Sequence, residues 1–271
     1  MKLFTVLAIS ATLCSGPMCY AQSFTTIYTF PNISAGYIPN GAPYIGAGGV
    51  LFATTAYGGT FVPCNGTVGC GTVFSLTPPS QTGGSWTETT LYSFQGSPDG
   101  LQPLAGVLPG ANGALLGTTV EGGPVNVHCH YGCGTLFQLT PPSQAGGAWT
   151  EEIFYDFAKQ DYGPGMLVAS GNGSYFGPAS FGGSKSCDPG CGWIYELLPP
   201  TGSSGDWSLT QIHGFMPDTG KYPTSNAPLV VGPGGVLYGT AEGGGNESRS
   251  CGSLGCGTAF SLTPPVSPST A

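Results

Sequence analysis

The sequence has 271 residues, of which only 7% are charged, and a formal net charge of −8 at neutral pH. An ordinary soluble domain has roughly 25% charged residues, so Thr, Ser, Asn, Gln and Gly must form most of the polar surface here. Five basic residues against 13 acidic ones leave no basic patch to neutralise phosphates. This balance argues against nucleic acid and anionic lipid as partners.

Residues 1–21 have the pattern of a secretory signal peptide. Lys2 supplies the positive start, an apolar core follows, and a small-x-small cleavage site ends at Ala21. The apolar core is too short to cross a bilayer, and no second apolar run follows it. We therefore expect a mature chain of residues 22–271, secreted to the extracellular space or the periplasm, with no transmembrane segment.

The first predicted β-strand, FTTIYTF at 24–30, is followed by an internal repeat. The stretch GCGTVFSLTPPSQTGGSWTETTLYSF at 69–94 recurs with changes at 132–157 and 190–215, and in part at 255–265. The glycine that opens its GT-aromatic segment recurs at Gly71, Gly134, Gly192 and Gly257. A unit of about 62 residues is therefore present four times.

Each unit contains four short β-like segments separated by Gly, Pro and Asn. In the second unit they are PLAGVL, ALLGTT, GTLFQLT and TEEIFYDF. Alternating polarity and frequent Thr, Val, Tyr and Phe favour strands, and no long window has a helical period. We predict an all-β fold, a small β-propeller of four four-stranded units of about 62 residues. The units form one domain and join at about residues 94, 157 and 215.

The two ends of the chain complement each other. FTTIYTF at 24–30 matches TTLYSF, the last strand of a unit, whereas the final unit ends in SLTPPVSPSTA and lacks that strand. We therefore predict that residues 24–30 pair as an outer strand with residues 257–263. This pairing would close the ring and leave no unpaired edge.

Two combinations of motifs are specific to a family: LYGTAEGG followed by CGTAFSLTPP, and GCGTVFSLTPP followed by a TTLYSF strand. They resemble the GloVer tandem-repeat family of secreted bacterial proteins, and the resemblance covers essentially the whole mature chain. It implies a propeller-like extracellular or surface protein, often with a variable C-terminal sorting anchor, and no established activity. After Leu262 there is neither an apolar tail nor a basic run, so anchoring by that route is not expected. No catalytic residue can be carried over from the family.

Each unit has one pair of cysteines between its GG motif and its GT-aromatic strand. The pairs are Cys64/Cys70, Cys129/Cys133, Cys187/Cys191 and Cys251/Cys256. A constant place with a variable spacing suits a disulfide that closes a short loop, and eight cysteines after a secretion signal indicate the same. Such a short loop is worth about 2 kcal/mol at most.

The alternative to disulfides is a metal or haem site at VHCHYGC, residues 127–133. His128 and His130 flank Cys129 there, which is the residue chemistry of a zinc centre. However, the other three cysteine pairs have no neighbouring histidine, and a zinc site needs four ligands in strict geometry. Haem attachment needs C-x-x-C-H, which is absent. We therefore predict no metal and no cofactor.

The loops opposite the near-identical PPSQ turns vary most between units, and variable loops on a repeated frame are typical of binding surfaces. The densest polar cluster on that face, with its neighbouring aromatic side chains, comprises Asp99, Glu121, His128, His130, Tyr131 and Tyr162. Hydrogen-bonding groups beside aromatic rings suit a carbohydrate ligand. We predict that these six residues bind an extracellular ligand such as a polysaccharide.

Two recurring residue types have alternative interpretations. The aspartates on the connections between units either form Asx turns or line a ring that binds a cation such as calcium; they are Asp99, Asp161 and Asp218. The tryptophans before the last strand of a unit either pack against the core or stack on sugars; they are Trp86, Trp149 and Trp207.

Catalytic signatures are absent from the sequence: it has no G-x-S-x-G elbow, H-E-x-x-H motif or P-loop. The leading hypothesis is a secreted, disulfide-stiffened propeller that recognises a polysaccharide or a cell-surface partner without catalysis. Two alternatives stay open. One is an envelope hydrolase or lyase that uses carboxylates, because Asp and Glu suffice for glycoside hydrolysis. The other is a purely structural surface repeat.

Overall fold

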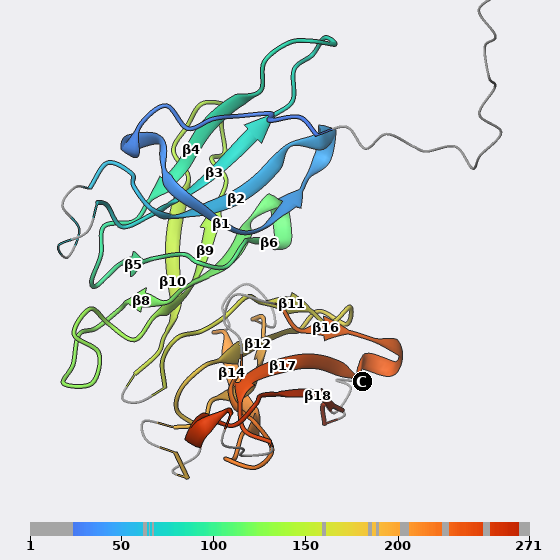
Figure 1. Cartoon of the computed structure of the whole chain (residues 1–271). Coiled ribbons are helices and arrows are strands. Elements are labelled where there is room, and N and C mark those ends of the chain that lie inside the picture. The colour runs from blue at the N-terminus through green and yellow to red at the C-terminus, as the bar shows by residue number, and fades with distance from the viewer. Residues whose placement is uncertain are drawn as a thin grey trace, which may run out of the picture.

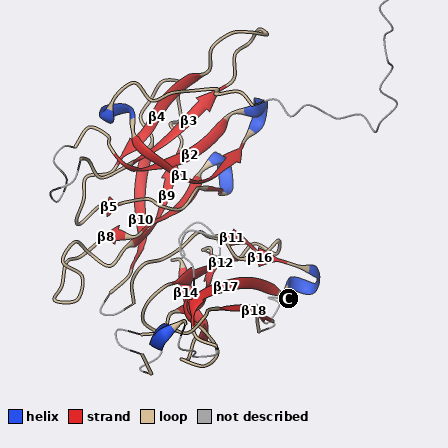
Figure 2. Cartoon of the chain, in the orientation of Figure 1, coloured by secondary structure: helices blue, strands red, loops and turns tan. Residues whose placement is uncertain are grey.

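The computed structural model describes residues 24–61, 64, 66, 68–158, 161–183, 186–187, 190–200, 206–223, 228–245 and 250–265. The predicted signal peptide lies outside these residues. Within them, β-strands and short 3-10 turns make up the regular structure, and there is no α-helix (Figure 2). The same described segments contain no helix long and apolar enough to span a bilayer.

Four antiparallel sheets are arranged as a four-bladed β-propeller, with one blade for each sequence repeat (Figure 1). Blade 1 consists of β1 (Tyr37–Ile45), β2 (Leu51–Tyr57), β3 (Thr72–Thr77) and β4 (Thr87–Ser93). Blade 2 consists of β6 (Leu108–Pro109), β7 (Leu115–Thr119), β9 (Thr135–Thr140) and β10 (Thr150–Asp156). Blade 3 consists of β11 (Val168–Ala169), β12 (Tyr175–Ala179), β13 (Trp193–Leu198) and β14 (Ser208–Gly214). The predicted all-β propeller is confirmed.

Blade 4 and one small ladder complete the described strands. Blade 4 consists of β16 (Val230–Val231), β17 (Leu237–Gly243) and β18 (Thr258–Leu262), and β15 (Lys221–Pro223) pairs with the far end of β17. A two-stranded ladder joins β5 (Gly100–Leu101) to β8 (Glu121–Gly122) between blades 1 and 2. The 3-10 turns are Ile33–Ala35, Ala47–Gly49, Ala111–Gly113, Pro233–Gly235 and Gly252–Leu254.

The third strand of a blade lies in its interior, which explains the GT-aromatic repeat. In β3 and β13 the first five residues are all buried. Gly117 of β7 lies opposite Phe137 of β9 in the strand register, and a methyl group at Gly117 would overlap the Phe137 ring. The glycine in LLGTT is therefore required by the aromatic residue of the neighbouring strand.

The hydrophobic core lies between successive blades. The ring of Phe94, just after β4, meets Phe137 of blade 2 edge-to-face, with centroids 5.1 Å apart. At the next boundary Phe157 lies 5.7 Å from Tyr195, and at the third Phe215 lies 5.0 Å from Phe260. At each of these three boundaries, the aromatic residue directly after the outer strand therefore packs against the next blade.

The expected pairing of residues 24–30 with residues 257–263 is absent. Residues 24–30 lie outside the strands, and among the described residues β18 pairs only with β17. The segment packs on blade 1, where the ring of Phe30 lies 5.1 Å from the ring of Phe74, as the ring of Phe94 lies against the blade that follows it. The predicted hydrogen-bonded ladder to residues 257–263 is therefore wrong, whereas the contact with blade 1 is the one expected of an outer strand that precedes it.

Candidate functional site

Each unit contains a disulfide, as predicted. The bonds join Cys64 to Cys70, Cys129 to Cys133, Cys187 to Cys191 and Cys251 to Cys256, with Cα–Cα separations from 5.1 to 5.3 Å. These separations are usual for disulfides. The described residues contain no group of three or more His, Cys, Asp or Glu that could hold a metal ion.

The disulfide loops position the connection that leads to the next blade. Gln102 donates its backbone N–H to the carbonyl of Cys70 at 2.9 Å, and Tyr222 donates to the carbonyl of Cys191 at 2.7 Å. Cys70 and Cys191 are fully buried. A cross-linked, buried residue therefore anchors the loop from which the inter-blade aspartates project.

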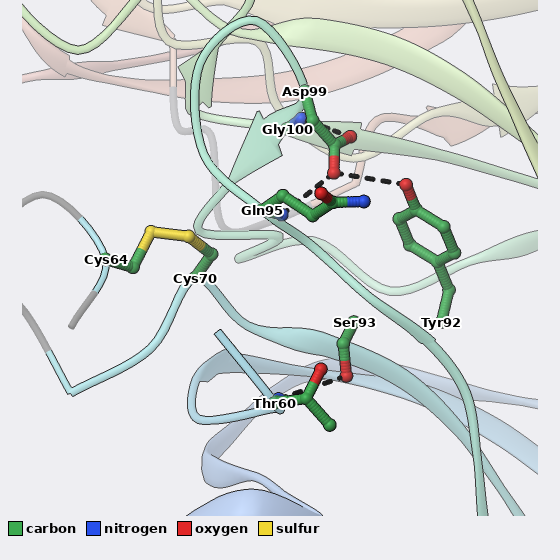
Figure 3. Close-up of a disulfide and its surroundings, with 8 residues drawn as sticks. All are labelled: Thr60, Cys64, Cys70, Tyr92, Ser93, Gln95, Asp99 and Gly100. Carbon is green, nitrogen blue, oxygen red and sulfur yellow. Dashed lines mark hydrogen bonds between the residues drawn. A yellow bond between two sulfur atoms is a disulfide. The ribbon is translucent and has the colours of Figure 1, made fainter. Parts of the chain in front are cut away.

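Asp99 is fixed by three hydrogen bonds on the loop between β4 and β5 (Figure 3). Its Oδ2 accepts from the Tyr92 hydroxyl at 3.1 Å and from the Gln95 backbone N–H at 2.8 Å. Its Oδ1 accepts from the Gly100 N–H at 2.6 Å. Burial raises the pKa of Asp99, whereas these hydrogen bonds lower it. The bonds to backbone N–H groups come from Gly100 and Gln95, not from the residue two positions after Asp99, so they fix the loop without forming an Asx turn.

A cavity of about 530 Å³ lies beside Asp99, between the loop 95–99 and strand β10. Tyr92, Glu151, Ile153 and Asp156 complete its lining. Three carboxyl groups therefore share one cavity. No basic side chain lines it, so the electrostatics of the cavity disfavour an anionic ligand.

Glu151 is the most perturbed acid of this cavity. Burial, together with the smaller effect of the negative charges of Asp99, Glu152 and Asp156, raises its pKa to about 8. Its Oε1 is buried and has no hydrogen-bond partner among the described residues. Partial burial also raises the pKa of Asp156. The cavity therefore holds at least one carboxyl group that is protonated at neutral pH and able to donate a hydrogen bond.

The structure places Glu121 close to Asp99 along the backbone. Glu121 lies opposite Leu101 in the β5–β8 ladder, and Gly123 donates its N–H to the carbonyl of Asp99 at 3.1 Å. Burial raises the pKa of Glu121. Its side chain, however, does not line the cavity beside Asp99.

The remaining predicted residues lie farther along the same side. His128, His130 and Tyr131 are on the disulfide loop, which is attached to β8 because Gly122 donates its N–H to the carbonyl of Tyr131 at 2.7 Å. Tyr162 lies at the boundary between blades 2 and 3, where its ring stacks on Phe181 at 4.3 Å. None of these residues lines the cavity beside Asp99. Their role in binding stays a prediction.

The predicted site omits Tyr92, Glu151 and Asp156, which lie in or next to outer strands. The sequence pattern placed candidate residues on the variable loops and not on these strands. One signal was available: Asp156 stands where the first unit has Ser93, and Glu151 stands where it has Glu88. The convergence of β4 and β10 on one cavity depends on how adjacent blades pack, which the repeat alone does not specify.

Among the recurring aspartates and tryptophans, Asp161 and Trp207 contact the neighbouring blade. Asp161 accepts a hydrogen bond from the Gly183 N–H at 3.1 Å through Oδ1, which joins the inter-blade connection to the following blade. Trp207 stacks on Phe154 of blade 2 at 4.4 Å, beside a second cavity of about 760 Å³ between blades 2 and 3. This contact favours packing as the role of Trp207.

Comparisons with known proteins agree with the repeat. A family model described as the Gloeobacter/Verrucomicrobia repeat matches residues 61–270, which include all four disulfides. No curated protein matches the chain. Among solved structures, one similar chain is a protein of unknown function from Dyadobacter fermentans DSM 18053. That similarity has 13% identity and a TM-score of 0.43, and covers 88% of this chain and 67% of the other.

Proposed function

The chain belongs to the Gloeobacter/Verrucomicrobia repeat family, and we propose that its propeller is a secreted recognition module that binds a neutral, hydroxyl-rich polysaccharide without catalysis. In this proposal, residues 1–21 direct export and residues 22–271 form one repeat domain. Four disulfides support an oxidising compartment, because such bonds persist outside the cytosol.

The observation that carries the proposal is the cavity formed by Tyr92, Asp99, Glu151 and Asp156. Its carboxyl oxygens can accept hydrogen bonds from sugar hydroxyls, and the protonated carboxyl of Glu151 can donate one. Tyr92 contributes an aromatic ring to the lining, and aromatic side chains are common in the lining of ligand pockets. The absence of a basic side chain from its lining favours a neutral glycan over a sulfated one.

The test is retention on a glycan array and in a polysaccharide pull-down. Wild-type protein is compared with Glu151→Gln and Asp156→Asn, and Glu152→Gln serves as the matched control because it lines the other cavity on the same strand. We expect at least tenfold weaker retention for the first two variants and unchanged retention for the control. Equal retention by all four proteins would exclude this cavity as the site.

The predicted loop cluster needs its own variant. A His128→Ala/His130→Ala double variant alters the disulfide loop without touching the cavity lining. If this variant loses retention while Glu151→Gln keeps it, the ligand binds at the loop cluster predicted from the sequence. If both lose retention, one extended site covers the cavity and the loop.

Glu151 also favours a second candidate function, a carboxylate-dependent glycoside hydrolase. A carboxyl group with a pKa of about 8 beside two other carboxyl groups has the protonation that a general acid needs at neutral pH. The acid would protonate the glycosidic oxygen, while a neighbouring carboxylate would activate water or attack the sugar. Release of reducing ends from a retained polysaccharide by wild type, and not by Glu151→Gln, would replace the binding proposal with this one.

A further inference from the structure

Residues 24–30 have the side-chain arrangement of an outer strand. Tyr28 and Phe30 form an edge-to-face pair with centroids 5.2 Å apart, and Tyr92 and Phe94 of blade 1 form the same pair at 5.1 Å. Phe30 then meets Phe74 at 5.1 Å, as Phe94 meets the next blade. The segment therefore lies against blade 1 as the outer strand of a preceding blade would, although it forms no ladder.

Strand β18 lacks the neighbour that covers the equivalent strand of every other blade. None of the residues Thr258–Leu262 is buried, whereas the first five residues of β3 are all buried. Phe94, which follows β4, donates its N–H to the carbonyl of Gly71 at 3.0 Å. The corresponding bond from Phe30 to Gly257 is not formed. We call this boundary, between β18 and residues 24–30, the open seam.

Neither side of the open seam contains a charged residue. FTTIYTF and TAFSL contain no Asp, Glu, Lys or Arg, and no proline interrupts either segment. Proteins normally protect a free edge with such residues, because an unprotected edge pairs with another strand. The composition of the two segments therefore favours strand pairing over exposure to water.

We propose that the open seam is a self-association surface, in which β18 of one copy pairs with residues 24–30 of a second copy. A second copy can supply residues 24–30 to β18 while the three inter-blade aromatic contacts of each chain stay as they are. Two reciprocal pairings related by a twofold axis close a dimer and leave no free edge. This inference is independent of the proposed ligand.

The repeat fixes the register of the pairing. Thr72 lies opposite Ser93 in blade 1, so Thr258 of one copy should lie opposite Thr29 of the other. The bond from Phe94 to Gly71 belongs to the adjacent pair, which makes this a pair without backbone hydrogen bonds. Such pairs bring the two side chains closest together, so they suit an engineered disulfide.

The test mixes two single-cysteine variants of the mature chain, Thr29→Cys and Thr258→Cys, under mild oxidation. We expect a disulfide-linked dimer in the mixture on non-reducing electrophoresis, well above the level in either variant alone. The control is Thr29→Cys mixed with Ser208→Cys, which places an exposed cysteine on β14. This mixture should form no more disulfide-linked dimer than either single variant alone. A mixture that forms no more dimer than the control overturns the proposal.

A double variant, Thr29→Cys/Thr258→Cys, distinguishes pairing between two chains from pairing within one chain. A cross-link between chains supports self-association, whereas a cross-link only within the monomer shows that the ring closes on itself and overturns it. Light scattering of the wild type should give the mass of two chains. Ala259→Lys, which places a charge on the exposed edge of β18, should give the mass of one chain with unchanged circular dichroism. A wild type with the mass of one chain also overturns the proposal.

Discussion

The ring of Phe94 lies edge-to-face on the ring of Phe137, with centroids 5.1 Å apart and an interplanar angle of 68°. Both side chains are completely buried, and they join the outer strand of one blade to the interior of the next. This contact recurs at the following boundaries, so a single aromatic position determines how neighbouring blades are held.

Phe94→Ala should lower the free energy of unfolding by about 3–5 kcal/mol, because it removes a buried ring and leaves a cavity between two blades. Phe24→Ala is the matched control, since the Phe24 side chain is 93% exposed, and should change stability by less than about 0.5 kcal/mol. Urea denaturation followed by tryptophan fluorescence measures both. A similar loss in the two variants would contradict the assignment of the core to the blade boundaries.

Gly117→Ala should destabilise the protein by about 1–3 kcal/mol, because the added methyl group overlaps the Phe137 ring inside blade 2. Gly214→Ala serves as the control, since a methyl group there meets only the flexible amide of Gln211. Thermal unfolding followed by circular dichroism compares the two variants. In a Phe137→Leu background, Gly117→Ala should cost less stability than it does in the wild type, because the ring that the methyl group overlaps is absent.

Removing the second disulfide with Cys129→Ser/Cys133→Ser should cost about 2 kcal/mol at most, because the closed loop is very short. The larger effect should be local. Backbone amides around residues 126–132 and at Gly122 should exchange faster with deuterium, because Gly122 bonds to the carbonyl of Tyr131 on that loop. Mass spectrometry of non-reduced peptides from the wild type should find all four bridges. Stoichiometric zinc in protein purified without reductant would contradict them.

The sequence was sufficient for features that the repeat carries within one unit. The spacing of GG, the cysteine pair and the GT-aromatic strand predicted a disulfide and a central strand in each blade, and Cys129–Cys133 and β9 are both present. Such features depend on residues near one another in the chain. The propeller followed because four similar sheets must bury the same face against a neighbour.

The sequence was insufficient where two units meet. Glu151 and Asp99 belong to different repeats, and only the packing of β10 beside the loop 95–99 brings them to one cavity. The open seam has the same origin. FTTIYTF has the composition of an outer strand and packs on blade 1 through Phe30 and Phe74, but its pairing with β18 depends on how the first and last blades meet.

Stability should fall between about pH 4.5 and pH 8 through the ionisation of Glu151. Its pKa rises from 4.5 to about 8 on folding, because burial disfavours the charged form. Below pH 4.5 the group is neutral in both states and costs nothing. As pH rises, the unfolded chain loses this proton first, so the folded state is progressively disfavoured until the folded pKa is passed. The groups that interact electrostatically with Glu151 are Asp99, Glu152, Asp156 and Tyr92, which are all acids, so none offsets the loss.

Glu151→Gln should therefore raise the free energy of unfolding above pH 8 and leave it unchanged near pH 4. One pKa unit corresponds to about 1.4 kcal/mol, but Glu151 is partly open to water, so we expect a gain of only about 1–2 kcal/mol. Urea denaturation of both proteins at intervals from pH 4 to pH 9 measures the difference. Glu152→Gln removes one negative charge from the same strand but keeps the buried Glu151 carboxyl, so its stability should still fall over this pH range. A difference between wild type and Glu151→Gln that does not grow with pH would show that Glu151 ionises as readily in the folded protein as in the unfolded chain. The cavity would then lack the protonated carboxyl on which the general-acid alternative depends.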